Sequence, residues 1–167
     1  YTLSTPWDVS TLSSSPVSSL YVGAYLSQLY DVSFNNSGDK MFILGGSDIL
    51  EYNLSTEWDI STASYYQADT STGGRFCFFK TDGSKLYIGS SSAATIYQYS
   101  LGTNWDISTL SYDSVSFSVN GEEGTPRGMF FRNDGSEFFI VGSGNNTIYK
   151  YDLSTNWDLS TASYSTI

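Results

Sequence analysis

Histidine is absent from the 167 residues, and cysteine occurs once. The lack of histidine excludes serine or cysteine triads with an imidazole base, histidine-ligated metal sites and imidazole acid–base chemistry. The single cysteine excludes a disulfide within the chain, and Cys77 stands among phenylalanines, which favours a buried inert thiol over a reactive one. The sequence also has no apolar run long enough to span a bilayer, so we expect no membrane insertion.

Basic residues are scarce as well. Seven lysines and arginines stand against 17 aspartates and glutamates, which gives a formal net charge of -10 and an isoelectric point near 4.1. A chain of this charge repels nucleic acid and anionic membrane surfaces at long range. Neither is therefore an expected partner.

Aromatic side chains are abundant, at 17% of the residues with 14 Tyr and 10 Phe. Ser, Thr, Gly and Asn fill the intervals between short apolar runs, and no helix-period pattern of useful length occurs. Strands and turns are favoured over helices. Since no break in composition divides the chain, we predict a single all-β domain over residues 1–167.

One segment recurs four times in the form Tyr-x-Leu-[Ser/Gly]-Thr-x-Trp-Asp-[Val/Ile/Leu]-Ser-Thr-[Leu/Ala]-Ser. The intervals between its copies are 51, 47 and 52 residues. Periods of this size indicate propeller blades, kelch-like units or a solenoid. The Trp-Asp pairs of the four copies are Trp7 and Asp8, Trp58 and Asp59, Trp105 and Asp106, and Trp157 and Asp158.

A second shared block precedes each of the last three copies, and it has the pattern of a hairpin around an Asp-Gly turn. In the clearest copy the pattern predicts strands over residues 128–132, 137–141 and 147–153, followed by a fourth around 160–165. The second strand is almost entirely apolar and the third alternates, as expected for inner and outer strands of one sheet. We therefore predict a β-propeller built of four-stranded antiparallel blades.

The repeats divide the chain into an outer-strand segment at residues 1–20 and full blades at 21–66, 67–115 and 116–167. A closed propeller needs about four to eight blades. Either the sequence is part of a longer chain, or several copies assemble to close the ring. We favour the longer chain, because the sequence starts without methionine and because open sheet edges pair readily.

The Trp-Asp pairs allow a binding role, since tryptophan stacks on sugars and aspartate can ligate calcium. Their presence in every copy favours a structural role instead, because a feature that each blade needs for folding must occur in each blade. We expect the tryptophan to pack between neighbouring blades and the aspartate to cap its own turn.

Function is expected in the loops that do not repeat. In a propeller the loops from the fourth strand to the next blade and those between the second and third strands share one face, and variable loops on a rigid scaffold carry binding. Glu122 and Glu123 form the sharpest acidic cluster and could bind a cation or a basic partner, although solvated loop charge is the favoured interpretation. The candidate binding residues are Asp69, Thr72, Arg75, Ser91, Ser92, Glu122, Glu123, Arg127, Asn145 and Asn146.

Catalysis has few candidate groups in this sequence. Paired carboxylates could hydrolyse glycosides, but no pair stands apart from the aspartates of the repeat. We predict that the protein is not an enzyme, and we expect no cofactor and no metal.

The repeat also resembles a known family. The block from Pro126, Pro-Arg-Gly-Met-Phe-Phe-Arg-Asn-Asp-Gly-Ser-Glu-Phe-Phe-Ile-Val-Gly, and the Leu-Ser-Thr-x-Trp-Asp-x-Ser-Thr-Ala-Ser segment that follows it are similar to a repeat of marine bacteriophage and bacterial proteins. The first copy departs from the family pattern because it lacks the Pro-x-Gly start, and Gly73-Gly74 replaces that start in the second.

The resemblance implies a non-enzymatic propeller on a virion surface or in the extracellular space, such as a tail fibre or capsid appendage that presents loops for attachment. Its expected partners are other virion proteins, further blades of the same propeller, or a host cell-surface glycan. A secreted bacterial lectin or adhesin that binds cell-surface carbohydrate is the alternative. The genes that surround its own would separate the two.

Overall fold

The structure, a computed structural model, describes residues 1–165. Its strands form three four-stranded antiparallel sheets, each built from strands consecutive in the chain and called here blades 1, 2 and 3. Blade 1 comprises β1 (Asp31–Phe34), β2 (Lys40–Gly45), β3 (Asp48–Leu54) and β4 (Ala63–Asp69); blade 2 comprises β5 (Phe76–Phe79), β6 (Lys85–Ser90), β7 (Thr95–Leu101) and β8 (Leu110–Ser118); blade 3 comprises β9 (Pro126–Phe131), β10 (Glu137–Gly142), β11 (Ile148–Leu153) and β12 (Ala162–Tyr164).

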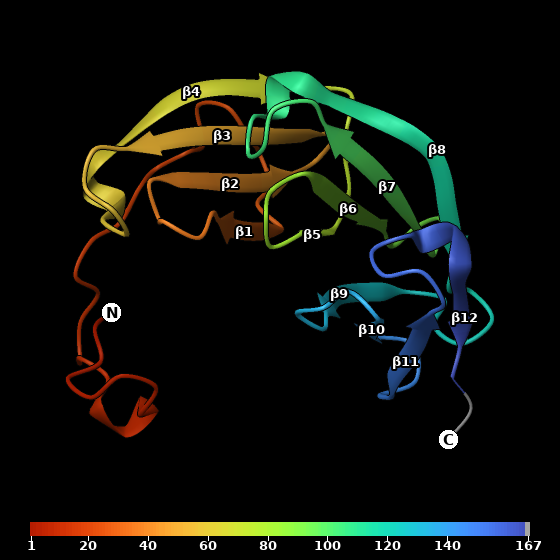
Figure 1. Cartoon of the computed structure of the whole chain (residues 1–167). Coiled ribbons are helices and arrows are strands. Elements are labelled where there is room, and N and C mark those ends of the chain that lie inside the picture. The colour runs from red at the N-terminus through yellow and green to blue at the C-terminus, as the bar shows by residue number, and fades with distance from the viewer. Residues whose placement is uncertain (166–167) are drawn as a thin grey trace.

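The three blades follow one another along an open arc (Figure 1). The first strand of each blade lies on the inner side of the arc, while β4 and β8 run along its outer side. Strand β1 contacts β5, and β5 contacts β9, so the first strands of all three blades adjoin one another. The all-β propeller architecture predicted from the sequence is confirmed.

The boundaries between blades differ from the predicted ones. Strands β4 and β8 continue to Asp69 and Ser118, past the predicted boundaries after residues 66 and 115. Each of these strands pairs with its neighbour across a bulge, and the pairing continues to Asp69 and Ser118.

The outer-strand segment predicted at residues 1–20 contains no named strand in the described structure. It contains a 3-10 helix and an isolated antiparallel bridge between Leu3 and Leu12. This bridge stands at the repeat position where Leu54 pairs with Ala63 at the start of β4 in blade 1. Further on, Val22 and Leu26 pack onto the face of blade 1 that blade 2 does not cover.

Each Trp-Asp segment forms the same turn. Its tryptophan takes a left-handed backbone conformation, with φ between 62 and 67°. The side chain of the following aspartate accepts a hydrogen bond from the serine N–H two residues on, and so caps a short 3-10 helix, as predicted. The four helices are η1 (Val9–Thr11), η2 (Ile60–Thr62), η3 (Ile107–Thr109) and η4 (Leu159–Thr161).

The glycine of the Asp-Gly turn is required by this tryptophan. The backbone N–H of Trp157 donates to the Gly135 carbonyl at 2.9 Å. Gly135 has a φ of +74°, and a β-carbon there would lie 2.3 Å from the Trp157 ring. The hairpin turn and the Trp-Asp turn therefore pack against each other at one end of each blade. The sequences of both turns are similar from blade to blade because each turn must fit the other.

Two of the four tryptophans occupy the inter-blade position that the repeat predicts. Trp157 stacks on Phe131 of its own blade, with ring centroids 5.4 Å apart, and reaches Phe78 of blade 2 at 6.4 Å. Trp105 repeats this arrangement between blades 1 and 2.

The other two tryptophans do not pack between blades. Among the described residues, the aromatic ring that Trp58 contacts is that of Phe34 in its own blade, and Trp58 is 59% exposed, while Trp7 is 96% exposed. The reason is the same for both: within residues 1–165, no blade precedes blade 1 to pack aromatic side chains against these two tryptophans.

The blades are joined by apolar faces. Phe42 and Ile49 of blade 1 pack against Leu86 and Ile88 of blade 2, and all four are buried. The free Cys77 lies in the same cluster, where burial raises the pKa of its thiol and the nearby Asp31 carboxylate raises it further. A thiol in this setting is unreactive, as the sequence predicts.

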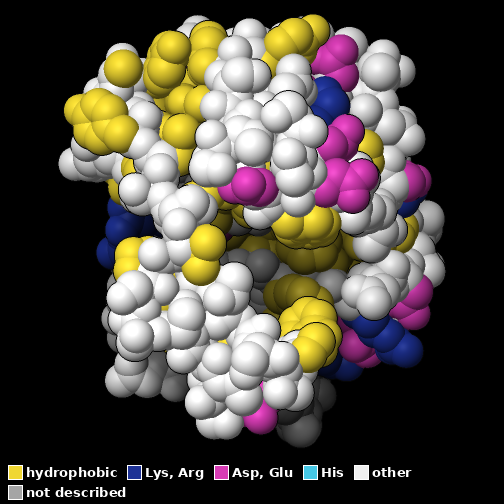
Figure 2. Space-filling view, turned by 90° about the vertical axis from the view of Figure 1, so that its left-hand side faces the viewer, with side chains coloured by type: hydrophobic (Ala, Val, Ile, Leu, Met, Phe, Trp, Pro, Cys, Tyr) yellow, Lys and Arg dark blue, Asp and Glu magenta, His cyan; other side chains and the backbone are white. Residues whose placement is uncertain are grey.

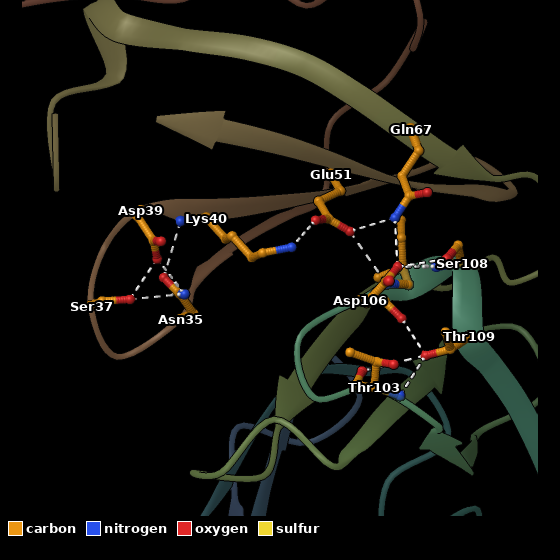
Figure 3. A network of polar contacts seen from close by, with 11 residues as sticks. Asn35, Ser37, Asp39, Lys40, Glu51, Gln67, Thr103, Asp106, Ser108 and Thr109 are labelled. Atoms are coloured by element: carbon orange, nitrogen blue, oxygen red, sulfur yellow. Dashed lines mark hydrogen bonds and ion pairs between the residues drawn. The ribbon is translucent and has the colours of Figure 1, made fainter. Parts of the chain in front are cut away.

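A polar contact also joins blades 1 and 2 (Figure 3). The fully buried Glu51 carboxylate forms an ion pair with Lys40 and accepts hydrogen bonds from Gln67 Nε2 at 2.8 Å and from the Ile107 backbone N–H of blade 2 at 3.3 Å. Gln98 repeats the contact one blade further on, because its Oε1 accepts the Leu159 N–H of blade 3 at 2.8 Å.

Candidate functional site

The two ends of the blades differ in chemistry. At one end lie the locked hairpin and Trp-Asp turns. At the other, the loop before β9 meets the loop between β10 and β11: Ser143 N–H donates to the Thr125 carbonyl at 3.1 Å, and Asn145 Nδ2 donates to the Glu122 carbonyl at 3.0 Å. The non-repeating loops therefore share one face, here called the loop face.

A polar hollow of about 440 Å³ opens on the loop face where all three blades meet. It is called here the three-blade hollow. Its walls come from the start of β1, the turn between β2 and β3, the loop before β5, the end of β6 with the loop after it, and the start of β9. The lining residues are Tyr30, Gly46, Ser47, Gly73, Gly74, Arg75, Ser90, Ser91, Ser92 and Arg127.

Three of these residues stand at one equivalent position of the repeat. Tyr30, Arg75 and Arg127 each lie four residues before the phenylalanine that ends the first strand of their blade. The backbone is held alike in blades 1 and 2, because the Tyr30 N–H donates to the Leu44 carbonyl at 2.8 Å and the Arg75 N–H to that of Gly89 at 2.7 Å. The fold thus brings three different side chains to a shared hollow.

Close backbone packing shapes the wall beside Arg75. A β-carbon on Gly73 would lie 2.4 Å from Ser47 Cα, and one on Gly74 would lie 2.3 Å from Ile88 Cγ2. Only glycine fits at either position without displacing its neighbour. This contact explains why two glycines stand at this point of the second copy.

The hollow is lined by hydrogen-bond donors and by no carboxylate. The Arg75 guanidinium lies over the Tyr30 ring, 4.1 Å from its centroid. Arg127 donates from Nε to Ser143 Oγ at 3.3 Å, and Ser91 donates to the Pro126 carbonyl. An arrangement of hydrogen-bond donors without a carboxylate can bind a polar ligand.

The hollow brings together four of the predicted binding residues, namely Arg75, Ser91, Ser92 and Arg127. Asp69 ends β4 and Thr72 lies in the loop between β4 and β5, and neither lines the hollow. Thr72 is 3% exposed, so its candidacy as a contact residue is wrong. Its loop folds back on itself, with Asp69 accepting the Ser71 N–H at 2.8 Å.

The interpretation of Glu122 and Glu123 as solvated charge is wrong for Glu123. Glu123 is fully buried, and its Oε1 accepts the backbone N–H groups of Thr125 at 2.9 Å and Gly144 at 3.0 Å. The hydrogen bond from the Thr125 N–H is the main cause that lowers the pKa of Glu123. Glu122 accepts a hydrogen bond from the Tyr151 hydroxyl at 3.1 Å.

Glu123 therefore connects two loops of blade 3 by hydrogen bonds, the loop before β9 and the loop between β10 and β11. Asn145 connects the same two loops through its bond to the Glu122 carbonyl, while Asn146 beside it is exposed and has a φ of 54°. None of the four residues reaches the three-blade hollow.

Sequence reasoning missed Tyr30, Gly46 and Ser47. Gly46 and Ser47 form the turn between β2 and β3. This turn is equivalent to the loops after β6 and β10, which were predicted from the sequence to carry binding residues. Aligning the copies on the last phenylalanine of the first strand would have found Tyr30 as the counterpart of Arg75.

No three His, Cys, Asp or Glu side chains within residues 1–165 gather in a way that could hold a metal ion. The helices of the same part of the chain are the three-residue turns η1 to η4, and none could cross a membrane.

Comparison with known proteins identifies the fold of the chain but not its function. No family model and no curated protein matches the chain. Solved structures do: the β-propeller domain of Myceliophteria thermophila Cps50 (Swd1) at 11% identity with a TM-score of 0.57, the periplasmic gluconolactonase PpgL of Pseudomonas aeruginosa at 12% and 0.56, and an auxiliary nutrient binding protein of Bacteroides thetaiotaomicron at 14% and 0.57.

Each of these alignments covers 83% of this chain, and they cover 42%, 40% and 32% of the respective structures. The chain thus spans less than half of the length of these three structures. By their descriptions the three proteins include an enzyme and a binding protein, so the shared fold does not define a function.

Proposed function

We propose that the chain is a non-catalytic binding module that holds its ligand on the loop face, in the three-blade hollow. The observation that carries this proposal is the convergence of Tyr30, Arg75 and Arg127, one from each blade, on a polar hollow without a carboxylate. Its volume of about 440 Å³ lies within the range of ligand sites, roughly 300–1,000 Å³.

The proposed setting is a virion surface, as a tail fibre or capsid appendage, where the module attaches to a host or to a neighbouring protein. The support for this setting is the resemblance of the repeat. A secreted bacterial lectin or adhesin is the alternative, and the same hollow serves both. Mass spectrometry of purified virions decides between them, since only the first predicts the chain among structural proteins.

Blocking the hollow tests the binding role. Ser92 is exposed at its rim, so Ser92→Trp places a large ring in the opening. We expect this variant to lose about tenfold or more of the affinity for host cells or for the glycan that an array identifies. Thr81→Trp is the matched control, because Thr81 is exposed in a hairpin turn at the opposite end of blade 2. Equal binding by the two variants contradicts the proposal.

We also propose that the outer faces of blades 1 and 3 bind further blades, which in the isolated chain come from a second copy. Ile148 on β11 is 69% exposed, whereas its equivalents Ile49 and Ile96 are fully buried against the next blade. The complementary face of blade 1 holds an apolar hollow of about 410 Å³ lined in part by Val32 and Met41. Figure 2 shows exposed hydrophobic side chains around a hollow on the left-hand side of the arc.

Both faces meet twice within the chain, at the junctions of blades 1 and 2 and of blades 2 and 3. A head-to-tail contact between copies would reproduce that junction. We expect the 167-residue chain to self-associate in light scattering, and Ile148→Glu to shift it towards monomer. Val9→Glu, at an exposed site on η1, is the control and should not. A monomer at all accessible concentrations contradicts this proposal.

A further inference from the structure

We propose that the three-blade hollow recognises an anionic saccharide, one that carries a carboxylate or sulfate group, through Arg75 and Arg127. This inference rests on the proposed binding function of the hollow and names the chemistry of its ligand. The argument starts from the distribution of positive charge over the whole chain.

Ion pairs occupy five of the seven basic side chains. They join Lys40 to Glu51, Lys80 to Asp82, Lys85 to Asp113, Arg132 to Asp134, and Lys150 to Glu137 and Asp152. Arg75 and Arg127 alone pair with no carboxylate among residues 1–165, and both line the same hollow. In a chain with 17 acidic residues, the two unpaired guanidinium groups stand together in a site without a carboxylate.

The two guanidinium groups keep free donors. Within the described structure the Arg75 side chain makes no hydrogen bond, and its guanidinium carbon lies over the Tyr30 ring. Arg127 commits only Nε, to Ser143 Oγ. Guanidinium has five N–H donors in a planar fork that matches the oxygens of a carboxylate or sulfate group.

The remaining wall suits the neutral part of a sugar. Ser47, Ser90 and Ser92 contribute hydroxyl groups, which can donate to and accept from sugar hydroxyls. Tyr30 contributes an aromatic ring beside the charged pair. An anionic group bound to the two arginines and sugar hydroxyls bound to the serines would together use the hydrogen-bond donors of the hollow. A neutral sugar would leave the positive charges of Arg75 and Arg127 without a counter-charge.

Calorimetric titration with paired probes tests the inference. The first pair is a galacturonic acid tetrasaccharide and its fully methyl-esterified form, and the second is sulfated dextran and dextran of equal length. The charged member of at least one pair should bind about tenfold or more tightly than its neutral partner. Which pair shows the difference tells carboxylate from sulfate.

Variants locate the effect. Arg75→Gln and Arg127→Gln should each reduce binding of the charged probe about tenfold or more, because each removes charge-assisted hydrogen bonds. Arg132→Gln is the matched control: Arg132 is 57% exposed at the opposite end of blade 3 and already pairs with Asp134, so its change should leave affinity within about twofold. Thermal unfolding of each variant confirms that it is folded.

The outcomes separate the two proposals. If neutral and charged probes bind alike, or if Arg132→Gln loses as much as the other variants, the anionic inference is wrong. If Ser92→Trp still abolishes attachment to the host surface in that case, the binding function stands. If no probe binds and Ser92→Trp changes nothing, both are wrong.

Discussion

Replacing Trp157 with alanine is expected to destabilise the chain by about 3–5 kcal/mol, while the same change at Trp7 alters stability by less than about 0.5 kcal/mol. Trp157 is 9% exposed and fills the space between blades 2 and 3, so its removal leaves a cavity lined by aromatic rings. Trp7 stands in the same sequence motif but is 96% exposed. The effect therefore depends on the presence of a preceding blade and not on the motif.

The comparison isolates packing from backbone strain. Both tryptophans have a left-handed backbone, with φ of 64 and 67°, and alanine keeps the β-carbon that makes this conformation costly. The backbone strain is therefore the same before and after each substitution, so it does not contribute to the change in the free energy of unfolding. Trp58, at 59% exposure, should fall between the two. Urea unfolding followed by far-ultraviolet circular dichroism gives the free energies, and equal losses at all three sites would contradict the inter-blade role.

The repeat predicts the blades because the pattern of each strand is local. Alternation in β11, the apolar run in β10 and the turn at Gly135 are decided by residues close in sequence, so the strands lie within a few residues of their predicted positions. In residues 1–20 the motif is complete, yet within the described structure it forms only the Leu3–Leu12 bridge and no named strand. A local pattern does not show whether a neighbouring strand is there to pair with it.

The candidate site was only partly predictable. Variation among copies pointed to Arg75 and Arg127 correctly as residues of the loop face. It could not show that Thr72 is buried or that Glu123 binds two backbone N–H groups, because both depend on how loops fold back onto a blade. An acidic side chain in a loop is usually solvated, and tertiary contacts reverse that rule at Glu123.

The second large effect is expected at Glu51. Glu51→Leu should destabilise the chain by about 3–5 kcal/mol, because it leaves the Lys40 ammonium and the Ile107 N–H without their acceptor inside the junction of blades 1 and 2. The same substitution also removes the acceptor that orients Gln67 towards Asp106 of the next blade (Figure 3). The loss thus combines one broken ion pair with unsatisfied donors from both blades.

Glu51→Gln is the matched variant, because blade 2 has a glutamine at the equivalent position. Gln98 accepts the Leu159 N–H and donates to Asp113, so an amide can make the inter-blade contact. We expect Glu51→Gln to keep the bond to Ile107 and to lose only the charge opposite Lys40, which is partly exposed and can turn to water. Its loss in urea unfolding should therefore be less than half that of Glu51→Leu. If the two variants lose the same free energy, the stabilisation by Glu51 comes from its ion pair with Lys40 inside blade 1 and not from the backbone contact to blade 2.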